Sequence, residues 1–299
     1  MTPCPTPCSP WSRSGTDPND PPSLWAGPLS RPGVSRMKPS RDTLFFALLF
    51  FVSLPLVLLV VLPLARMLTQ PGPADLWETI GDPVVLRALA RSLGTSLAAA
   101  GTCLVFGTPL AYVLARKGFP GKRLVEGIVD LPIMIPHPVI GIAILSLAGR
   151  NHPLGQFLSR LGIQIMGTYW GIIAVLAFVG LPFFVNTTKA GFESVPTRLE
   201  KASRSLGAGV GHTLFRITLP LSWPHIVLGM IMCTARAISE FGAIVIVAYH
   251  PMTAPVLIYE RFTAYGLQYS QPICVWLIVI SFLLFVGMRF ISRYRGVET

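Results

Sequence analysis

The chain has 299 residues, of which 52% are hydrophobic and only 12% are charged. Soluble proteins carry about 25% charged residues, so this composition argues against a soluble enzyme. With several apolar runs of about twenty residues, it predicts an all-α protein that crosses the membrane repeatedly. The net charge of +11 is attributed to cytoplasmic loops rich in Lys and Arg, and not to a surface that binds nucleic acid.

The N-terminal stretch has a different composition from the rest. Residues 1–36 are rich in Pro, Ser, Gly and Asp and lack apolar periodicity, which predicts a disordered extension. The membrane domain then occupies residues 37–299. Because a basic flank begins at Met37, we hypothesise that Met37 is the real start of the protein. An N-terminal peptide from residues 1–36 in mass spectrometry of the native protein would rule this out.

Apolar runs of membrane-spanning length recur along the membrane domain. The third run contains Pro132, Pro136 and Pro138. These prolines remove backbone donors, so this segment should face protein or a water-lined pathway and not lipid. In chain order, the six predicted spans are about 43–65, 92–114, 127–148, 169–188, 225–248 and 272–291.

Loop charge predicts the orientation of these spans. If the N-terminus lies inside, the inner segments hold 17 Lys or Arg residues and the outer segments hold 6. The positive-inside rule then places both termini in the cytoplasm. It also places the long polar loop that contains about 193–220 in the cytoplasm.

The 193–220 loop is predicted to form two short helices joined by a flexible elbow. Thr197 and Glu200 fit a capping box at the first helix. Gly207 suits the left-handed position after its end, and Pro220 is expected to stop the second helix. Such a knob in a cytoplasmic loop is suited to docking a partner. It could equally be an ordinary amphipathic connector between spans.

The spacing of Gly207, nine further residues and then Ile217-x-Leu219-Pro220 resembles the EAA loop of permease subunits of binding-protein-dependent ABC importers. In that family the loop contacts the ATPase. The family's Glu-Ala-Ala falls on Lys201-Ala202-Ser203, and the acidic residue is one place early. The coupling residues that the resemblance implies are Glu200, Lys201, Ala202, Ser203, Gly207, Ile217, Leu219 and Pro220.

Charges inside the fifth span are the second candidate site. Arg236 and Glu240 are four residues apart and share a helix face. They either form a structural salt bridge, or Arg236 offers a positive charge to a passing anion. Thr234 and Ser239 would then add neutral donors. In the third span, His137 beside Pro136 either touches substrate or bonds to carbonyls that the prolines leave free.

Several stretches together resemble the molybdate/tungstate branch of the ABC permeases, with sulfate permeases as near relatives. The resemblance implies a type I permease fold in the inner (cytoplasmic) membrane and a pair of permeases. It also implies two copies of an ATPase subunit and an extracytoplasmic oxyanion-binding protein. The stretches are 120–132, 135–137, 235–243 and 254–261.

The chain lacks the Gly-x4-Gly-Lys-Ser/Thr phosphate loop. It is therefore predicted to be a transport subunit and not an enzyme, to bind no cofactor, and to rely on ATP hydrolysis by a partner. Its His, Cys, Asp and Glu residues form no ligand-spaced metal set. A secondary anion transporter would need interrupted helices at matching positions, and only one proline-rich span is evident. Since the chain has one coupling loop, a homodimer is expected.

Overall fold

The computed structural model describes residues 41–149 and 152–294, which are helical and contain no β-strand. The predicted disordered extension 1–36 and the proposed start at Met37 lie outside the described residues. The chain divides into two units, residues 1–58 and 59–299. The first contains the beginning of α1 (Arg41–Thr69), an apolar helix long enough to cross a membrane. The second carries both candidate sites.

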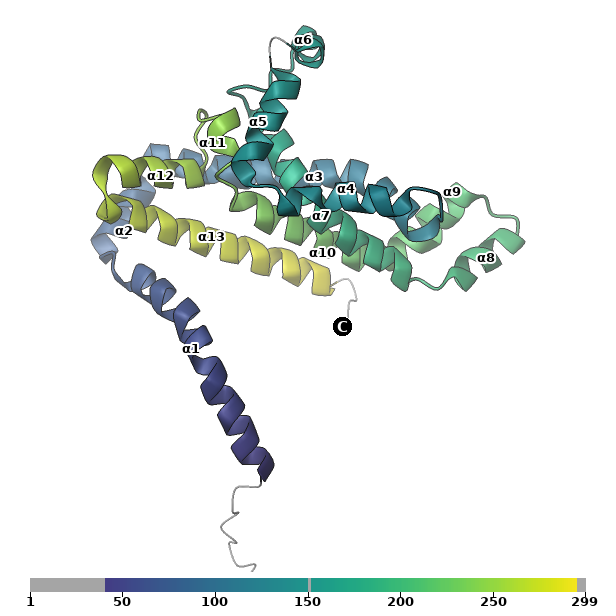
Figure 1. The fold of residues 1–299 in the computed structure, drawn as a ribbon, viewed down its shortest axis with the longest axis horizontal. Helices are drawn as coiled ribbons and strands as arrows, with labels where there is room; N and C mark the ends of the chain where they lie inside the picture. The colour runs from purple at the N-terminus through teal and green to yellow at the C-terminus, as the bar shows by residue number, and fades with distance from the viewer. Residues whose placement is uncertain (1–40, 150–151, 295–299) are drawn as a thin grey trace, which may run out of the picture. The chain divides into compact units, whose positions relative to one another are not determined.

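Three long helices form the core of the second unit: α3 (Pro83–Arg116), α7 (Tyr169–Ser194) and α10 (Leu219–Ile238). They run side by side (Figure 1). Close packing depends on small residues. A Cβ on Gly180 would lie 2.4 Å from the Cys233 sulfur, and one on Gly107 would lie 2.8 Å from the Phe184 ring. These glycines therefore set how closely α7 approaches α10 and α3.

Shorter helices close one end of this bundle. They are α2 (Pro73–Gly81), α12 (Ala254–Tyr265) and the start of α13 (Leu267–Tyr294). Trp276 of α13 donates to the Leu76 carbonyl over 2.9 Å, and the Ser92 hydroxyl accepts from the Ala254 N–H over 2.8 Å. The opposite end carries α8 (Thr197–Ser205) and α9 (Val210–Thr213) (Figure 1).

The third predicted span is not one helix. It consists of α4 (Lys122–Met134) and α5 (His137–Ala148), which are bent by 116° at the break between them. The helix breaks at Pro136 and Pro138, because neither can donate a backbone hydrogen bond. Within the described residues, five helices are long and apolar enough to span a membrane, and six spans result if the bent pair counts as one. A short α6 (Pro153–Arg160) follows.

A second interruption occurs where the sequence predicted a continuous fifth span. The helix α10 begins at Leu219 and ends at Ile238, and the chain turns through residues 239–243 before α11 (Ile244–Val247). The buried Glu240 carboxylate accepts from the Ala243 N–H over 3.0 Å. This bond satisfies a backbone donor in the turn and stabilises the break. The fifth span, predicted at about 225–248, is therefore not one continuous helix.

Candidate functional site

The elbow after α8 has the geometry predicted for it. Gly207 has a φ of +88°, the left-handed conformation that glycine adopts without steric cost. Its N–H donates to the Arg204 carbonyl over 3.0 Å, and the Ala208 N–H donates to the Ser203 carbonyl over 3.2 Å. This pair of bonds is a Schellman motif that ends α8. A Cβ at Gly207 would meet no atom within 4 Å, so the glycine serves backbone conformation and not packing inside the chain.

The Glu200 side chain is largely covered by its own chain and does not form the predicted capping box. Pro196 takes the N-cap position of α8, which places Thr197 within the helix. The Glu200 Oε1 atom accepts from Arg116 Nε over 2.9 Å and from the Thr218 hydroxyl over 2.8 Å. Arg116 also donates to the Val195 carbonyl over 2.9 Å. A single carboxylate oxygen thus joins α8 to the end of α3 and to the segment before α10.

Pro220 does not stop the second helix of the loop. The chain continues from α9 through the π-helical turn η1 (Leu214–Thr218) directly into α10. The Leu219 N–H donates to the Leu214 carbonyl, five residues earlier. This wider register brings Pro220 into the first turn of α10, where its missing N–H costs little. The loop and α10 are therefore continuous.

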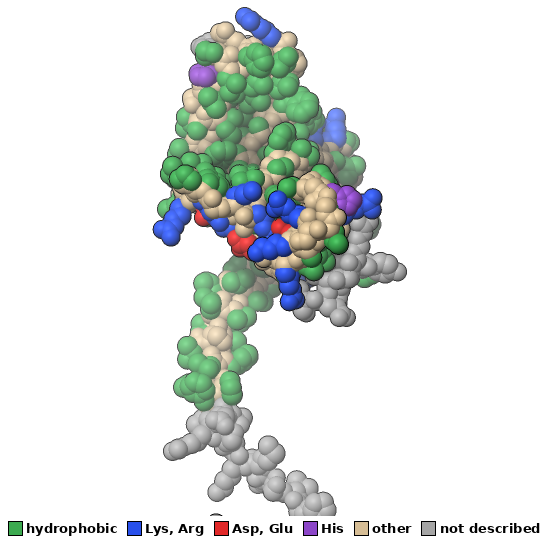
Figure 2. Space-filling view, turned by 90° about the vertical axis from the view of Figure 1, so that its right-hand side faces the viewer, with side chains coloured by type: hydrophobic (Ala, Val, Ile, Leu, Met, Phe, Trp, Pro, Cys, Tyr) green, Lys and Arg blue, Asp and Glu red, His purple; other side chains and the backbone are tan. Residues whose placement is uncertain are grey.

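The outer surface of the loop presents cations and apolar side chains together. Lys201 and Ala202 are exposed, whereas Ser203 is half-buried and its hydroxyl lies 3.0 Å from that of Thr213. Leu206 is 89% exposed and Phe215 is 68% exposed. Figure 2 shows Lys and Arg side chains gathered around this end of the molecule. The exposed cations of the loop are Arg198, Lys201, Arg204 and Arg216.

The charged residues of the fifth span meet His137. Arg236 Nη2 lies 3.0 Å from Glu240 Oε2 and contacts His137 Nε2, which is 3.4 Å from the same carboxylate oxygen. Of the two alternatives that the sequence left open, the structure contains the contact between Arg236 and Glu240. His137 contacts these charged side chains instead of the proline-freed carbonyl that the sequence suggested. The Ser239 hydroxyl donates to the Arg236 carbonyl over 3.0 Å, and its oxygen lies 3.4 Å from Arg236 Nη1.

Two of the predicted pathway residues, Thr234 and Pro136, add no polar side chain to this group of contacts. Thr234 is fully buried, and its hydroxyl donates to the Met230 carbonyl of its own helix over 2.8 Å, so it supplies no donor to the cluster. Pro136 is the N-cap residue of α5 and places His137 at the first helical position. We call the remaining four residues, His137, Arg236, Ser239 and Glu240, the charged cluster.

The charged cluster lies where the two helix breaks pack together. A Cβ on Gly242 would lie 3.1 Å from the His137 Cβ, and one on Gly141 would lie 2.8 Å from the Ala243 carbonyl. These glycines let the α4–α5 break approach the α10–α11 turn. Ala237 shares a buried cluster with Ala99, near the middle of α3. The charged cluster therefore lies beside a buried apolar cluster, where the two helix breaks meet.

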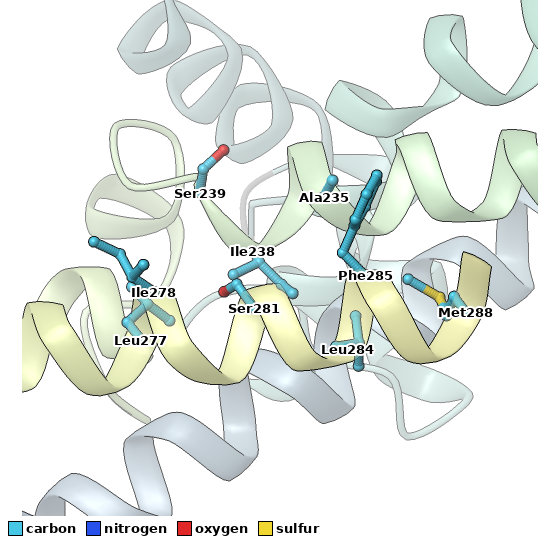
Figure 3. A pocket seen from close by; sticks show the side chains of 9 residues that line it. All are labelled: Ala235, Ile238, Ser239, Leu277, Ile278, Ser281, Leu284, Phe285 and Met288. Atoms are coloured by element: carbon cyan, nitrogen blue, oxygen red, sulfur yellow. The ribbon is translucent and has the colours of Figure 1, made fainter. Parts of the chain in front are cut away.

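A groove of about 300 Å³ borders the charged cluster between α10 and α13. Ala235, Ile238 and Ser239 line its α10 side, and Ser239 carries an oxygen at one end of the groove (Figure 3). Apart from Ser281, the residues from α13 are apolar: Leu277, Ile278, Leu284, Phe285 and Met288.

The described residues contain no group of three or more His, Cys, Asp or Glu that could hold a metal ion. Sequence reasoning missed Arg116, which lies 84 positions from Glu200, because no local pattern indicates such a contact. It also missed the second helix break. The sequence feature that could have indicated this break is Gly242, which follows the charged Glu240 by two positions near the end of an apolar run.

Comparison with known proteins agrees with this architecture. The chain is 44% identical over 238 residues to a molybdate/tungstate transport system permease protein, WtpB, of Pyrococcus abyssi, covering 79% of this chain and 91% of the relative. It is 33% identical over 252 residues to a sulfate transport system permease protein, CysT, of Synechococcus elongatus, covering 81% and 91%.

A solved structure of a bacterial alginate ABC transporter with a periplasmic protein shares the fold, with a TM-score of 0.66 at 18% identity over 87% of this chain and 97% of that chain. The model of the family described as binding-protein-dependent transport system inner membrane component matches residues 107–294. The chain belongs to this family of inner membrane transport components.

Proposed function

We propose that this protein is the permease subunit of an ABC importer that moves molybdate or tungstate into the cell. The observation that carries this proposal is the difference in identity between the two kinds of relative. A permease named for molybdate/tungstate is 44% identical to the chain, whereas one named for sulfate is 33% identical, over similar shares of this chain. Sulfate is therefore the alternative substrate that an experiment must separate.

Energy for transport comes from a separate ATPase subunit that docks on the α8–η1 segment. Three features support this surface. It is exposed, it combines four cations with Leu206 and Phe215, and its elbow has a fixed backbone conformation. Apolar anchors surrounded by charge are typical of specific protein interfaces. The basic end of the bundle also supports a cytoplasmic location for this segment.

The working assembly contains two copies of this chain, two ATPase subunits and an extracytoplasmic oxyanion-binding protein. One chain provides one α8–η1 segment, so two ATPases require two permeases. A face of α3 supports the pairing. Gly94 and Ala98 are exposed, and Cβ atoms added at Gly94 and Gly101 would meet nothing within 4 Å in this chain. Such small residues allow the close approach of a helix from another subunit.

The proposal is tested by reconstitution in proteoliposomes. The permease, its ATPase and the binding protein are combined with ATP, and uptake of molybdate, tungstate and sulfate is measured separately. We expect ATP-dependent uptake of molybdate and tungstate, with sulfate transported at least tenfold more slowly. Preferential uptake of sulfate would reassign the substrate. Uptake driven by an ion gradient without ATP would refute the importer mechanism.

A further inference from the structure

We propose that Arg236, His137 and Ser239 form a transit site for the tetrahedral oxyanion, and that Glu240 keeps this site weak by competing for the arginine. The inference rests on the proposed function and deepens it. It assigns a chemical role to each member of the charged cluster. It also accounts for a carboxylate on the route of an anion, where a negative charge would otherwise oppose passage.

Glu240 is a fixed counter-charge. Its side chain is 1% exposed, and each of its oxygens has a partner. Oε1 accepts from the Ala243 N–H over 3.0 Å, and Oε2 accepts from Arg236 over 3.0 Å. The backbone of the α10–α11 turn therefore anchors the carboxylate. Since it is buried and anchored, it cannot turn away to water when an anion arrives.

Arg236 retains capacity for a second partner. Glu240 and His137 both lie at Nη2, while Nη1 meets the Ser239 hydroxyl only at 3.4 Å, longer than a normal hydrogen bond. A guanidinium has five N–H donors in a planar fork suited to oxyanions. The side chains of Arg236 and His137 are 22% and 38% exposed, and Ser239 is exposed. An anion can reach this side of the cluster without disturbing Glu240.

The charge balance explains why binding there would be weak. Arg236 and Glu240 together are neutral, so a divalent oxyanion meets the directed N–H donors of the guanidinium but no net positive charge. The Ser239 hydroxyl, which donates to the Arg236 carbonyl, must turn to donate to the anion. A pathway must bind its substrate well enough to admit it and weakly enough to release it. An unpaired arginine in the middle of the bundle would hold a dianion strongly. The neutral pair avoids this and also lowers the cost of placing the arginine inside a membrane.

The position of the cluster agrees with a transit role. It lies where the α4–α5 break meets the α10–α11 turn, next to a buried apolar cluster that includes Ala99 and Ala237. Non-helical backbone at membrane depth is tolerated where it is buried in protein or lines a water-filled cavity. The cluster combines such backbone with exposed polar side chains.

The first experiment measures equilibrium binding of tungstate to the purified permease–ATPase complex, without binding protein or nucleotide. We expect weak binding by the wild type and binding at least about tenfold tighter by Glu240→Gln, because the competing charge is removed. The double variant Arg236→Gln/Glu240→Gln should lose that gain. Glu126→Gln is the matched control, since it removes a carboxylate paired with Lys189 over 2.6 Å outside the cluster. Its binding should equal that of the wild type.

A second pair of variants keeps the test decisive if Glu240→Gln does not assemble. Ser239 is exposed, so substitution there should spare folding. Ser239→Asp places a carboxylate beside Arg236 Nη1 and should lower uptake at least about tenfold, whereas the similarly sized Ser239→Asn should keep most of it. Equal uptake by the two variants would overturn the proposal. So would an assembled Glu240→Gln complex that binds tungstate no more tightly than the wild type.

The two proposals fail in different ways. If the importer carries another substrate, reconstituted wild-type protein will not take up molybdate or tungstate, yet Glu240→Gln will still bind tungstate more tightly. If the transit site is wrong, wild-type uptake will proceed normally and the Glu240→Gln gain in binding will be missing.

Discussion

The substitution Glu200→Gln tests how the α8–η1 segment is connected to the transmembrane helices. Glutamine keeps the size of the side chain and an oxygen that can accept from Arg116 and Thr218. It removes the negative charge that forms the ion pair with Arg116. The side chains of the pair are only 9% and 14% exposed, so solvent cannot replace the lost charge fully. We therefore expect α8 to separate from α3 more readily while the bundle stays folded.

The size of the effect follows from the contacts. Hydrogen bonds to charged groups contribute about 1.5–3 kcal/mol each, and the glutamine oxygen retains part of that. We therefore expect the free energy that holds α8 against α3 to fall by about 2 kcal/mol. This loss corresponds to about a 30-fold increase in the population with α8 undocked. An undocked α8 can follow the ATPase without moving α3 or α10. The consequence is ATP hydrolysis that is less tightly linked to uptake.

The assay compares ATP hydrolysis and molybdate uptake in the same proteoliposomes. For Glu200→Gln we expect the ratio of ATP hydrolysed to anion imported to rise several-fold, and the α8 amides to exchange with deuterium faster. Glu193→Gln is the matched control. Its side chain is 49% exposed and lies 3.8 Å from Lys189, so the ratio should not change. A wild-type ratio in an assembled Glu200→Gln complex would refute the reasoning.

The remaining predictions concern the elbow, the charged cluster and the assembly. Gly207→Asp should leave the permease inserted but uncouple ATP hydrolysis from uptake. Gly162→Asp is the control, since Gly162 also has a positive φ of +79° and open space around it, and it should not uncouple the two. Normal uptake by Gly207→Asp would contradict the prediction. Thermal stability should fall when either Arg236 or Glu240 is replaced by Ala, and the double variant should lose less than the sum; additive losses would argue against a coupled pair. Native mass spectrometry should find two copies of this chain with two ATPases, and a different second permease would disprove the homodimer.

The parts of the fold that were predictable from sequence are those set by local spacing. Glycine after a helix end predicts a left-handed turn, and Gly207 adopts it. Two charges four residues apart were expected to share a helix face; Arg236 and Glu240 do pair, although α10 ends at Ile238 and Glu240 lies in the turn that follows. Neither prediction needs knowledge of other helices. The same holds for the apolar runs, whose length alone identifies the helices able to cross a membrane.

One error arose from distant contacts and the other from an unusual local helical turn. Thr197 and Glu200 have the spacing of a capping box, but Arg116 and Thr218 take the carboxylate. Pro220 is a helix breaker in isolation, yet a π-helical turn lets the helix form around it. The capping-box error depends on partners 84 and 18 positions away from Glu200, which a window along the sequence does not include. The Pro220 error depends on a contact over five residues, from the Leu219 N–H to the Leu214 carbonyl.

The continuity of η1 and α10 gives a physical link between the two candidate sites. Thr218 at the end of η1 is bonded to Glu200, and Arg236 lies in the last turn of α10. Had Pro220 ended a helix, a hinge would separate the α8–η1 segment from the bundle and absorb its movement. Instead, a helix of 20 residues, about 30 Å long, joins the two. Where α10 moves as one body, displacement of α8 shifts Arg236 relative to His137, which belongs to α5 and not to this helix; Pro224 inside α10 is the position at which the helix could bend instead. The contact between Arg236 and His137 is therefore where movement of the α8–η1 segment would alter the proposed transit site.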